Sequence, residues 1–286
     1  MTHIRMKEFT RTEFEELKEL AEEIKDEDSS FEYDDNHIAL HIFQWYYGKN
    51  KFGFDMEDIE DRLAEDGYVI VENVFSPEEV NDLKNDVYEW QKTIPNHDKF
   101  HNTANPHGIY KHHRNGNTRH SWKIRINEKL QSIYHYLWKT NELVVSLDGS
   151  CYIPKNLAKK DSNWTHTDQS PVNDSKCFQG FVALTDNSER TLVVHKGSHL
   201  YHEQYFKDYP PKDMKSNWQK INPDALDKIS DTRIALKIPA GSLVLWDSRT
   251  FHQNQYGAPL SEERIVQYVC FLPKNVPENN EKMRNK

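Results

Sequence analysis

Cysteine is scarce in this chain of 286 residues, where only Cys151, Cys177 and Cys270 occur. The three are widely spaced, which excludes a disulfide scaffold and is typical of proteins from a reducing compartment. Long apolar runs are missing too, so no segment is suited to cross a bilayer. The stretch from Met1 to Lys7 is polar and lacks the apolar segment of a secretory signal. These absences predict a soluble, cytoplasmic protein without a membrane partner.

Positive charge is also in deficit. Set against 46 Asp and Glu residues, the 37 Lys and Arg residues leave a net charge of −9. Nucleic-acid binding draws on basic side chains that displace counterions from phosphates, so this balance argues against a nucleic-acid partner. With 36% hydrophobic residues the chain can still bury a core. Histidine is frequent, at 15 residues, and it is the commonest metal-ligating side chain.

The chain divides into three parts. Apolar residues recur at helical spacing from Phe14 to Ile24, which predicts an amphipathic helix within an N-terminal extension, residues 1–54. Residues 55–275 have the length of one large domain and are expected to form it. Residues 276–286 are expected to form a polar tail.

Two helices can be located at the start of this domain. Met56 and Leu63 lie on one face of a short helix, which Gly67 is expected to stop. The run from Ser76 to Glu79 begins a second helix, because Ser76 can cap it and Glu79 completes a capping box.

Beyond a third helix, expected at residues 126–138, nearly every segment resembles a strand. Short runs rich in β-branched and aromatic residues occur there at 143–148, 177–184, 191–195, 234–238, 242–246 and 265–272, and one further strand-like run, 68–74, comes before that helix. This spacing predicts a mainly β fold with flanking helices, a sandwich or jelly roll. Residues 97–125 are expected to form long loops, and residues 201–231 a loop or short helices. Both segments are expected to be walls of one pocket.

One short run carries metal-binding chemistry. In WTHTD, residues 164–168, strand alternation points His166 and Asp168 to the same face. His252, beyond a turn and an apolar strand far along the chain, can supply a third ligand. Two histidines and one carboxylate are the facial triad of non-haem Fe(II) oxygenases. The pair alone could instead be an ion pair at a strand end, and an isolated histidine is more often a hydrogen-bonded core residue.

Arg264 opens the last apolar strand. If that strand pairs antiparallel with the strand before it, through a turn at residues 256–263, Arg264 lies near His252 on the same inward face. An inward arginine needs an anion, and its fork of donors suits a carboxylate. The sequence therefore predicts an anion site beside the third histidine.

Together these segments resemble the phytanoyl-CoA dioxygenase-like (PhyH) family of Fe(II)/2-oxoglutarate-dependent oxygenases. The resemblance covers about residues 55–273. It rests on Asp66-Gly67-Tyr68-Val69, Phe75-Ser76-Pro77-Glu78-Glu79, the pair of His166 and Asp168, the run Leu192 to His199, the strand from Gly241 to His252, and Arg264. Two departures lie in a turn away from the ligands. Asn187-Ser188-Glu189-Arg190 replaces the usual paired glycines, and His195-Lys196 stands where a proline usually precedes Gly-Ser-His.

The resemblance implies a double-stranded β-helix, a cupin-like jelly roll. It implies that Fe(II) is held by His166, Asp168 and His252, and that the distal carboxylate of 2-oxoglutarate is bound by Arg264. Asn254 and Gln179 match positions that often contact the co-substrate in family members. With O2 as the other co-substrate, the implied reaction is hydroxylation, with succinate and CO2 as co-products. Because Asp168 is present, hydroxylation is favoured over halogenation.

The substrate has to be inferred from the polar residues expected near the iron. The candidates that could line its pocket are Lys111, His120, Trp122, Arg125 and Asp148. Their polarity favours a substrate with a carboxylate, a phosphate or several hydroxyls, and solvated loops explain them equally well. We expect a polar small-molecule substrate. Two alternatives stay open: an oxygenase acting on a protein side chain or methylated base, and a non-enzymatic jelly-roll binding protein.

Overall fold

The computed structural model describes residues 52–97, 106–173 and 175–275. The helix predicted between Phe14 and Ile24 lies outside these residues, as does the tail at residues 276–286. Within the described part of the chain, no helix is both long enough and apolar enough to cross a membrane.

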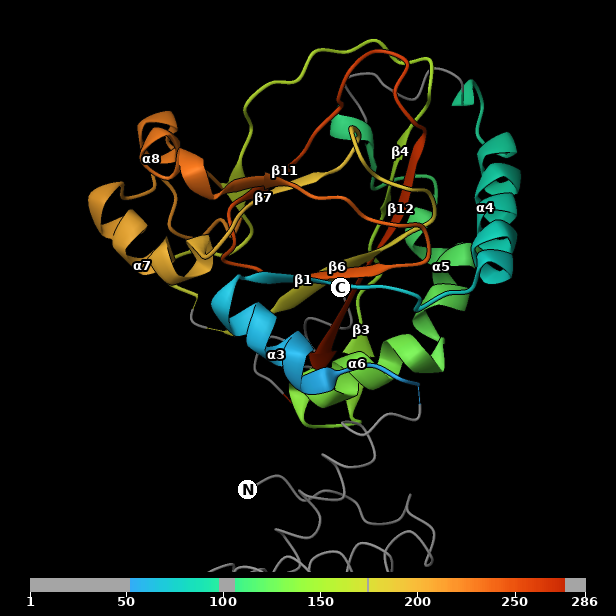
Figure 1. Ribbon diagram of the computed structural model, residues 1–286, viewed down its shortest axis with the longest axis horizontal. Coiled ribbons are helices and arrows are strands. Elements are labelled where there is room, and N and C mark those ends of the chain that lie inside the picture. The colour runs from blue at the N-terminus through green and yellow to red at the C-terminus, as the bar shows by residue number, and fades with distance from the viewer. Residues whose placement is uncertain (1–51, 98–105, 174, 276–286) are drawn as a thin grey trace, which may run out of the picture.

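Two antiparallel sheets face each other across the centre of the molecule (Figure 1). The large sheet has the order β1-β10-β6-β12-β4-β2, with β3 also pairing with β12. Its strands are β1 (Tyr68–Val71), β2 (Ile109–Tyr110), β3 (Leu143–Val145), β4 (Ser150–Ile153), β6 (Phe178–Ala183), β10 (Leu243–Asp247) and β12 (Arg264–Pro273). The small sheet has the order β8-β5-β11-β7-β9. Its strands are β5 (His166–Thr167), β7 (Leu192–His195), β8 (Gln219–Lys220), β9 (Arg233–Ala235) and β11 (His252–Asn254). The predicted jelly roll with flanking helices is confirmed.

Helices cover the outside of this pair of sheets. Figure 1 shows α3 and α6 beneath the large sheet, with α7 and α8 at the left beside the small sheet. The α-helices are α3 (Met56–Glu65), α4 (Pro77–Lys92), α5 (Arg119–Arg125), α6 (Glu128–Trp138), α7 (Ser198–Asp208) and α8 (Pro223–Lys228). The short 3-10 helices are η3 (Pro106–Gly108), η4 (Asn115–Asn117) and η5 (Ser230–Thr232).

Side-chain alternation divides the core into two layers. On β6, Phe178 and Val182 pack in the cluster that includes α3, α4 and α6 residues, whereas Phe181 belongs to the cluster between the sheets. β10 alternates in the same way, with Leu245 facing the helices and Trp246 facing inward. Because the period of a strand is two, each strand of the large sheet presents every second side chain to the space between the sheets. The candidate site lies in this space.

The start of α4 follows directly from its sequence. The Ser76 hydroxyl accepts a hydrogen bond from the Glu79 amide at 3.2 Å, and the Glu79 carboxylate accepts one from the Ser76 amide at 2.7 Å. Pro77 occupies the first turn, where a missing N–H leaves no helical partner unsatisfied. The predicted capping box is therefore confirmed.

Removal of this cap gives a first test of the energetics. Ser76→Ala is expected to lower the free energy of unfolding by about 1 kcal/mol, because an amide of the first turn loses its acceptor. Urea denaturation followed by circular dichroism measures the change. Ser230→Ala is the control, since this exposed serine stands at a 3-10 turn rather than at a helix cap. Equal midpoints for the two variants would contradict the assigned role of Ser76.

The predicted pairing of the last strand with the strand before it is wrong. β11 pairs with β5 and β7 in the small sheet, whereas β12 pairs with β3, β4 and β6 in the large sheet. His252 does not lie in a loop after β10. It is the first residue of β11, which belongs to the opposite sheet. In a jelly roll the chain crosses from one sheet to the other between consecutive strands, which the sequence pattern alone does not reveal.

The two segments predicted as pocket walls contain more regular structure than expected. Residues 201–231 form most of α7, then β8, then α8 and the start of η5, so the short-helix alternative is the one observed. Residues 119–125, expected to be loop, form helix α5. Thr118 caps this helix, accepting a hydrogen bond from the Ser121 amide. This local capping box was not recognised in the sequence.

Candidate metal centre

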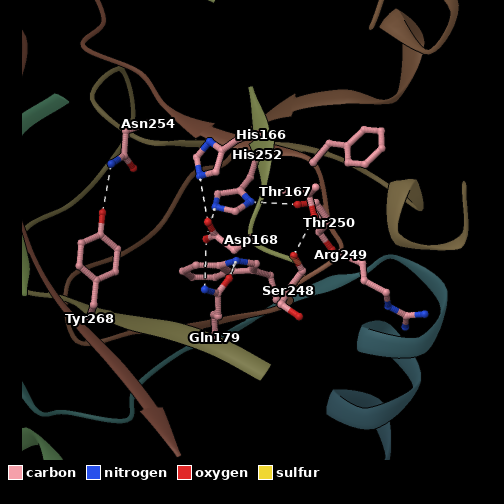
Figure 2. Close-up of polar contacts among 12 residues, drawn as sticks. His166, Thr167, Asp168, Gln179, Ser248, Arg249, Thr250, His252, Asn254 and Tyr268 are labelled. Carbon is pink, nitrogen blue, oxygen red and sulfur yellow. Dashed lines mark hydrogen bonds and ion pairs between the residues drawn. The ribbon is translucent and has the colours of Figure 1, made fainter. Parts of the chain in front are cut away.

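Three ligand-type side chains converge on one point between the sheets. His166 on β5 and His252 on β11 are directly opposite each other in the antiparallel pair, so both project from the same face. Asp168 follows β5 at the next inward position. Its two carboxylate oxygens lie 3.6 Å from His166 Nε2 and 3.5 Å from His252 Nε2 (Figure 2). One potential ligand atom from each residue lies within 4.8 Å of the others, a spacing that could hold a metal ion.

Both imidazoles are oriented by backbone carbonyls. His166 Nδ1 lies 3.2 Å from the Trp164 carbonyl, and His252 Nδ1 lies 2.9 Å from the Thr250 carbonyl. A carbonyl oxygen can only accept, so each Nδ1 carries the proton and each Nε2 keeps its lone pair for a metal. Burial, with the neighbouring His252 as a smaller cause, lowers the pKa of His166 to about 3. The neutral form, which metal binding requires, is therefore the stable one.

The carboxylate of Asp168 is held in place by a chain of two hydrogen bonds. Gln179 on β6 donates from Nε2 to Asp168 Oδ2 at 3.1 Å. Trp246 on β10 donates from its indole nitrogen to Gln179 Oε1 at 2.8 Å, which fixes the orientation of the amide. The structure thus places Gln179 against the carboxylate ligand, and Trp246, besides packing in the core, orients Gln179.

The three residues open onto a cavity of about 670 Å³. This volume lies within the range of pockets that enclose small organic ligands. The cavity is lined by residues of both sheets and of the two wall segments, including His107, Lys111, Asp148, Trp164, Cys177, Asn254, Trp218, Lys220, Tyr268 and Cys270. Both segments predicted as pocket walls therefore contribute to one cavity at the metal cluster.

Arg264 is completely buried on the inner face of the large sheet. Its guanidinium lies over the Phe181 ring, donates from Nε to Asn187 Oδ1 at 2.9 Å, and leaves NH2 without a partner among the described residues. An orphaned buried donor on a charged group is costly, and it is suited to a carboxylate. The inward direction expected for Arg264 is observed, although it arises from pairing of β12 with β4 and β6.

Asn254 lies on the cavity two residues beyond His252. Its side-chain nitrogen donates to the Tyr268 hydroxyl at 3.1 Å, so the two polar groups form a pair that spans the space between the sheets (Figure 2). Tyr268 was not singled out from the sequence, where it is one aromatic residue within an apolar strand. It shares the inward face of β12 with Arg264, because the two are four residues apart on one strand.

The five predicted substrate residues separate into two groups. Lys111 and Asp148 line the cavity. His120, Trp122 and Arg125 do not belong to its described lining, because the helix α5 turns them elsewhere. His120 is buried beside Trp90 and pairs with the Thr118 hydroxyl, and the Arg125 guanidinium donates to the Gly116 carbonyl. Trp122 is 41% exposed and donates to Asn117.

Aromatic rings next to His166 were also missed from the sequence. The Trp164 ring lies 4.8 Å from the His166 ring at 18°, and the Trp218 ring lies 5.4 Å from it at 29°. His107 stacks in turn on Trp164 at 3.7 Å. Trp164 is the first residue of the run 164–168, two positions before His166, and could have been suspected. Trp218 had no such signal, since its position depends on the two-residue strand β8.

His199 has a structural position. Its Nε2 lies 3.0 Å from the carbonyl of Ala64 at the end of α3, so it joins the Gly197 turn to that helix.

Two thiols on the cavity lie close together. Cys177 Sγ and Cys270 Sγ are 3.9 Å apart, although 93 residues separate them in sequence.

Two histidines and a carboxylate on the inner surface of a jelly roll are typical of the non-haem Fe(II) oxygenases. Comparison with known proteins agrees with this class. The family model for phytanoyl-CoA dioxygenase (PhyH) matches residues 63–255, more than half of the chain. The chain therefore belongs to the phytanoyl-CoA dioxygenase family, as its sequence motifs predicted, and it is an enzyme of the dioxygenase type.

Individual relatives are more distant. The protein "Ava biosynthesis cluster protein O" of Aspergillus versicolor is 27% identical over 240 residues, which cover 76% of this chain and 78% of that protein. Among solved structures, the epimerase SnoN, in complex with Fe3+, alpha ketoglutarate and nogalamycin RO, superposes with a TM-score of 0.54 at 20% identity. This match covers 76% of this chain and 83% of SnoN. EctD from S. alaskensis, with 2-oxoglutarate and 5-hydroxyectoine, gives a TM-score of 0.52 at 15% identity over 74% of this chain and 73% of its own. These likenesses support the fold.

Proposed function

We propose that this chain is an Fe(II)- and 2-oxoglutarate-dependent dioxygenase that hydroxylates a polar small molecule and releases succinate and CO2. The observation that carries the proposal is the cluster of His166, Asp168 and His252 at the wall of a ligand-sized cavity. The presence of iron and alpha ketoglutarate in SnoN, and of 2-oxoglutarate in EctD, supports the same cofactor and co-substrate for this chain.

The residues present fit these groups. His166 and His252 offer neutral nitrogens whose direction is set by carbonyls, and Asp168 offers a carboxylate whose direction is set by Gln179. Fe(II) and 2-oxoglutarate, when bound, would supply the electrons that activate O2, which is the oxidant for an unactivated C–H bond. The NH2 group of Arg264, which has no partner among the described residues, would bind the distal carboxylate of the co-substrate. Of the five predicted substrate residues, Lys111 and Asp148 line the cavity and remain candidates for substrate binding.

Asp148, which is half-buried on the cavity wall, contributes a carboxyl group. It accepts a hydrogen bond from the Ser146 hydroxyl, and burial raises the pKa of Asp148 above its usual range. A carboxyl that is protonated more readily than normal can donate as well as accept a hydrogen bond. We propose that it binds a hydroxyl or amide of the substrate.

We propose a cytoplasmic location from the cysteine content of the chain. Its three cysteines, Cys151, Cys177 and Cys270, are widely spaced in sequence, which is typical of proteins from a reducing compartment.

The proposed reaction is tested by co-product formation. Purified protein with Fe(II), ascorbate, O2 and 2-oxoglutarate is expected to release succinate, and the rate is expected to rise when the panel of candidate substrates contains a true substrate. The panel comprises amino acids, acyl carriers, sugars, aromatic acids, peptides and methylated oligonucleotides. A chelator should stop the reaction, because turnover depends on the metal ion that the three side chains hold.

Two results would count against the proposed function. Failure of the protein to bind 2-oxoglutarate in the presence of Fe(II) would remove its basis. Stimulation by peptides or methylated oligonucleotides alone would favour an oxygenase that acts on a macromolecule.

A further inference from the structure

A short edge strand adds two side chains to the surroundings of the metal cluster. β8 pairs antiparallel with β5, which places Lys220 opposite His166 and Gln219 opposite Thr167. Residues directly opposite in an antiparallel pair project from the same face. Lys220 therefore lies on the face of the small sheet that carries His166, and both residues line the cavity. Trp218, two residues earlier, shares that face and lines the cavity too.

Trp218 presents a large apolar ring at this position. The ring lies roughly parallel to the His166 imidazole, with centroids 5.4 Å apart, yet 48% of the residue is exposed. Trp164 and His107 extend the aromatic wall in the same stack, with centroids 3.7 Å apart. Covering an exposed indole with a flat apolar group removes apolar surface from water and so stabilises the complex. Aromatic rings prefer offset-stacked or edge-on contacts.

The charge on the cavity is unevenly distributed. Lys220 and Lys111 are the two lysines of its lining, and they come from different wall segments. Both are exposed, and neither forms an ion pair within the part of the chain that the structure describes. The acidic residues of the lining are Asp168, which faces the two histidines, and Asp148, which is hydrogen-bonded to Ser146. An anion on the substrate would therefore meet uncommitted positive charge next to the aromatic wall.

We propose that the substrate is a planar ring system that bears an acidic group, with the ring against Trp218 and the anion on the Lys220 ammonium. This inference rests on the proposed function and narrows its substrate class. A carboxylate and a phosphate would both satisfy the lysine, so the shared chemistry is an anion attached to a flat ring.

The proposal is tested by binding rather than turnover. Full-length protein is loaded anaerobically with Fe(II) and 2-oxoglutarate, and calorimetry measures the affinity of 2-naphthoate, 2-naphthyl phosphate, 2-naphthamide and cyclohexanecarboxylate. At least one naphthyl anion is expected to bind ten times more tightly than the neutral amide and than the non-aromatic acid. Comparison of 2-naphthoate with 2-naphthyl phosphate shows whether the site prefers a carboxylate or a phosphate.

Variants assign the two preferences to the two residues. Lys220→Gln should remove the preference for naphthyl anion over amide, and Trp218→Ala should remove the preference for naphthyl over cyclohexyl. Trp218→Phe should restore most of the ring preference. Lys215→Gln and Trp122→Ala are matched controls, because both residues are exposed and lie outside the cavity lining. The controls should bind the probes as the unmodified chain does.

The outcomes separate this inference from the proposed function. If 2-oxoglutarate binds but no naphthyl anion is preferred, or if Lys220→Gln leaves the preference unchanged, the substrate class is wrong and the oxygenase assignment stands. If Lys220→Gln weakens 2-oxoglutarate instead, the lysine serves the co-substrate and the inference is overturned. If 2-oxoglutarate does not bind to the unmodified chain, the proposed function fails, and the substrate class falls with it.

Discussion

Asp168→Ala is expected to abolish 2-oxoglutarate turnover and to leave the protein folded. The carboxylate is the one anionic member of the cluster, and its oxygens lie 3.6 and 3.5 Å from the two imidazole nitrogens. Loss of an outer hydrogen-bond partner of a metal ligand costs about 10- to 100-fold in affinity or activity, so loss of the ligand itself should cost more than about 100-fold. The Asp168 side chain is 27% exposed and lies outside the apolar clusters, which is why the fold should survive.

Metal content after dialysis against Fe(II) and succinate release are the two measurements. Asp227→Ala, an exposed carboxylate on α8, is the matched control and should retain both. Circular dichroism and the unfolding temperature establish that the Asp168 variant is native. If this variant kept normal turnover, these three residues would not form the metal site.

A second large effect is expected at Arg264. Arg264→Ala should weaken 2-oxoglutarate binding by roughly 30- to 700-fold, which corresponds to the loss of about 2–4 kcal/mol from a buried charge-assisted contact. The guanidinium is fully buried and its NH2 meets no acceptor in the part of the chain that the structure describes, so the distal carboxylate would lose both its charge partner and its hydrogen bonds. Arg264→Lys should rescue only part of the affinity, because an ammonium cannot bind a carboxylate with a planar fork.

Replacing a buried arginine also destabilises the fold, so the control variant must replace a buried arginine as well. Arg125 is buried to a similar extent, but its guanidinium donates to the Gly116 carbonyl, whereas that of Arg264 donates to Asn187. Arg125→Lys and Arg264→Lys are compared by calorimetry with 2-oxoglutarate on the Fe(II)-loaded protein. Only the second should bind the co-substrate more weakly. Equal affinities in these two variants would show that Arg264 serves the fold rather than the co-substrate.

Local signals predicted most elements of this fold. The α4 helix starts where Ser76 and Glu79 can exchange hydrogen bonds, and α3 gives way to β1 at Gly67, whose φ of +82° suits glycine. A side chain there would meet the His199 ring at 2.5 Å, so the turn also needs the missing Cβ. These features depend on residues a few positions apart, which is why the sequence reveals them.

Long-range features were predicted less well. The alternation of His166 and Asp168 is local, but the strand that faces them depends on how the chain crosses between sheets. Arg264 was expected to face inward because its strand would pair with the strand before it, and that pairing does not occur. It faces inward because strand alternation along β12, in the large sheet, points it into the space between the sheets. Trp218 and Lys220 were missed because β8 exists only through its pairing with β5. A two-residue strand has too little periodicity to be read from sequence.

The stack of rings around His166 has a consequence for how the protein can be observed. Indole groups fluoresce, and a paramagnetic or redox-active metal ion close to an indole quenches its emission. Trp164 and Trp218 have ring centroids 4.8 and 5.4 Å from the His166 ring, and the Trp246 ring lies 5.3 Å from the His252 ring. Three of the seven tryptophans therefore surround the cluster. The chain carries its own optical reporter, through which metal loading can be followed in real time without a label or a substrate.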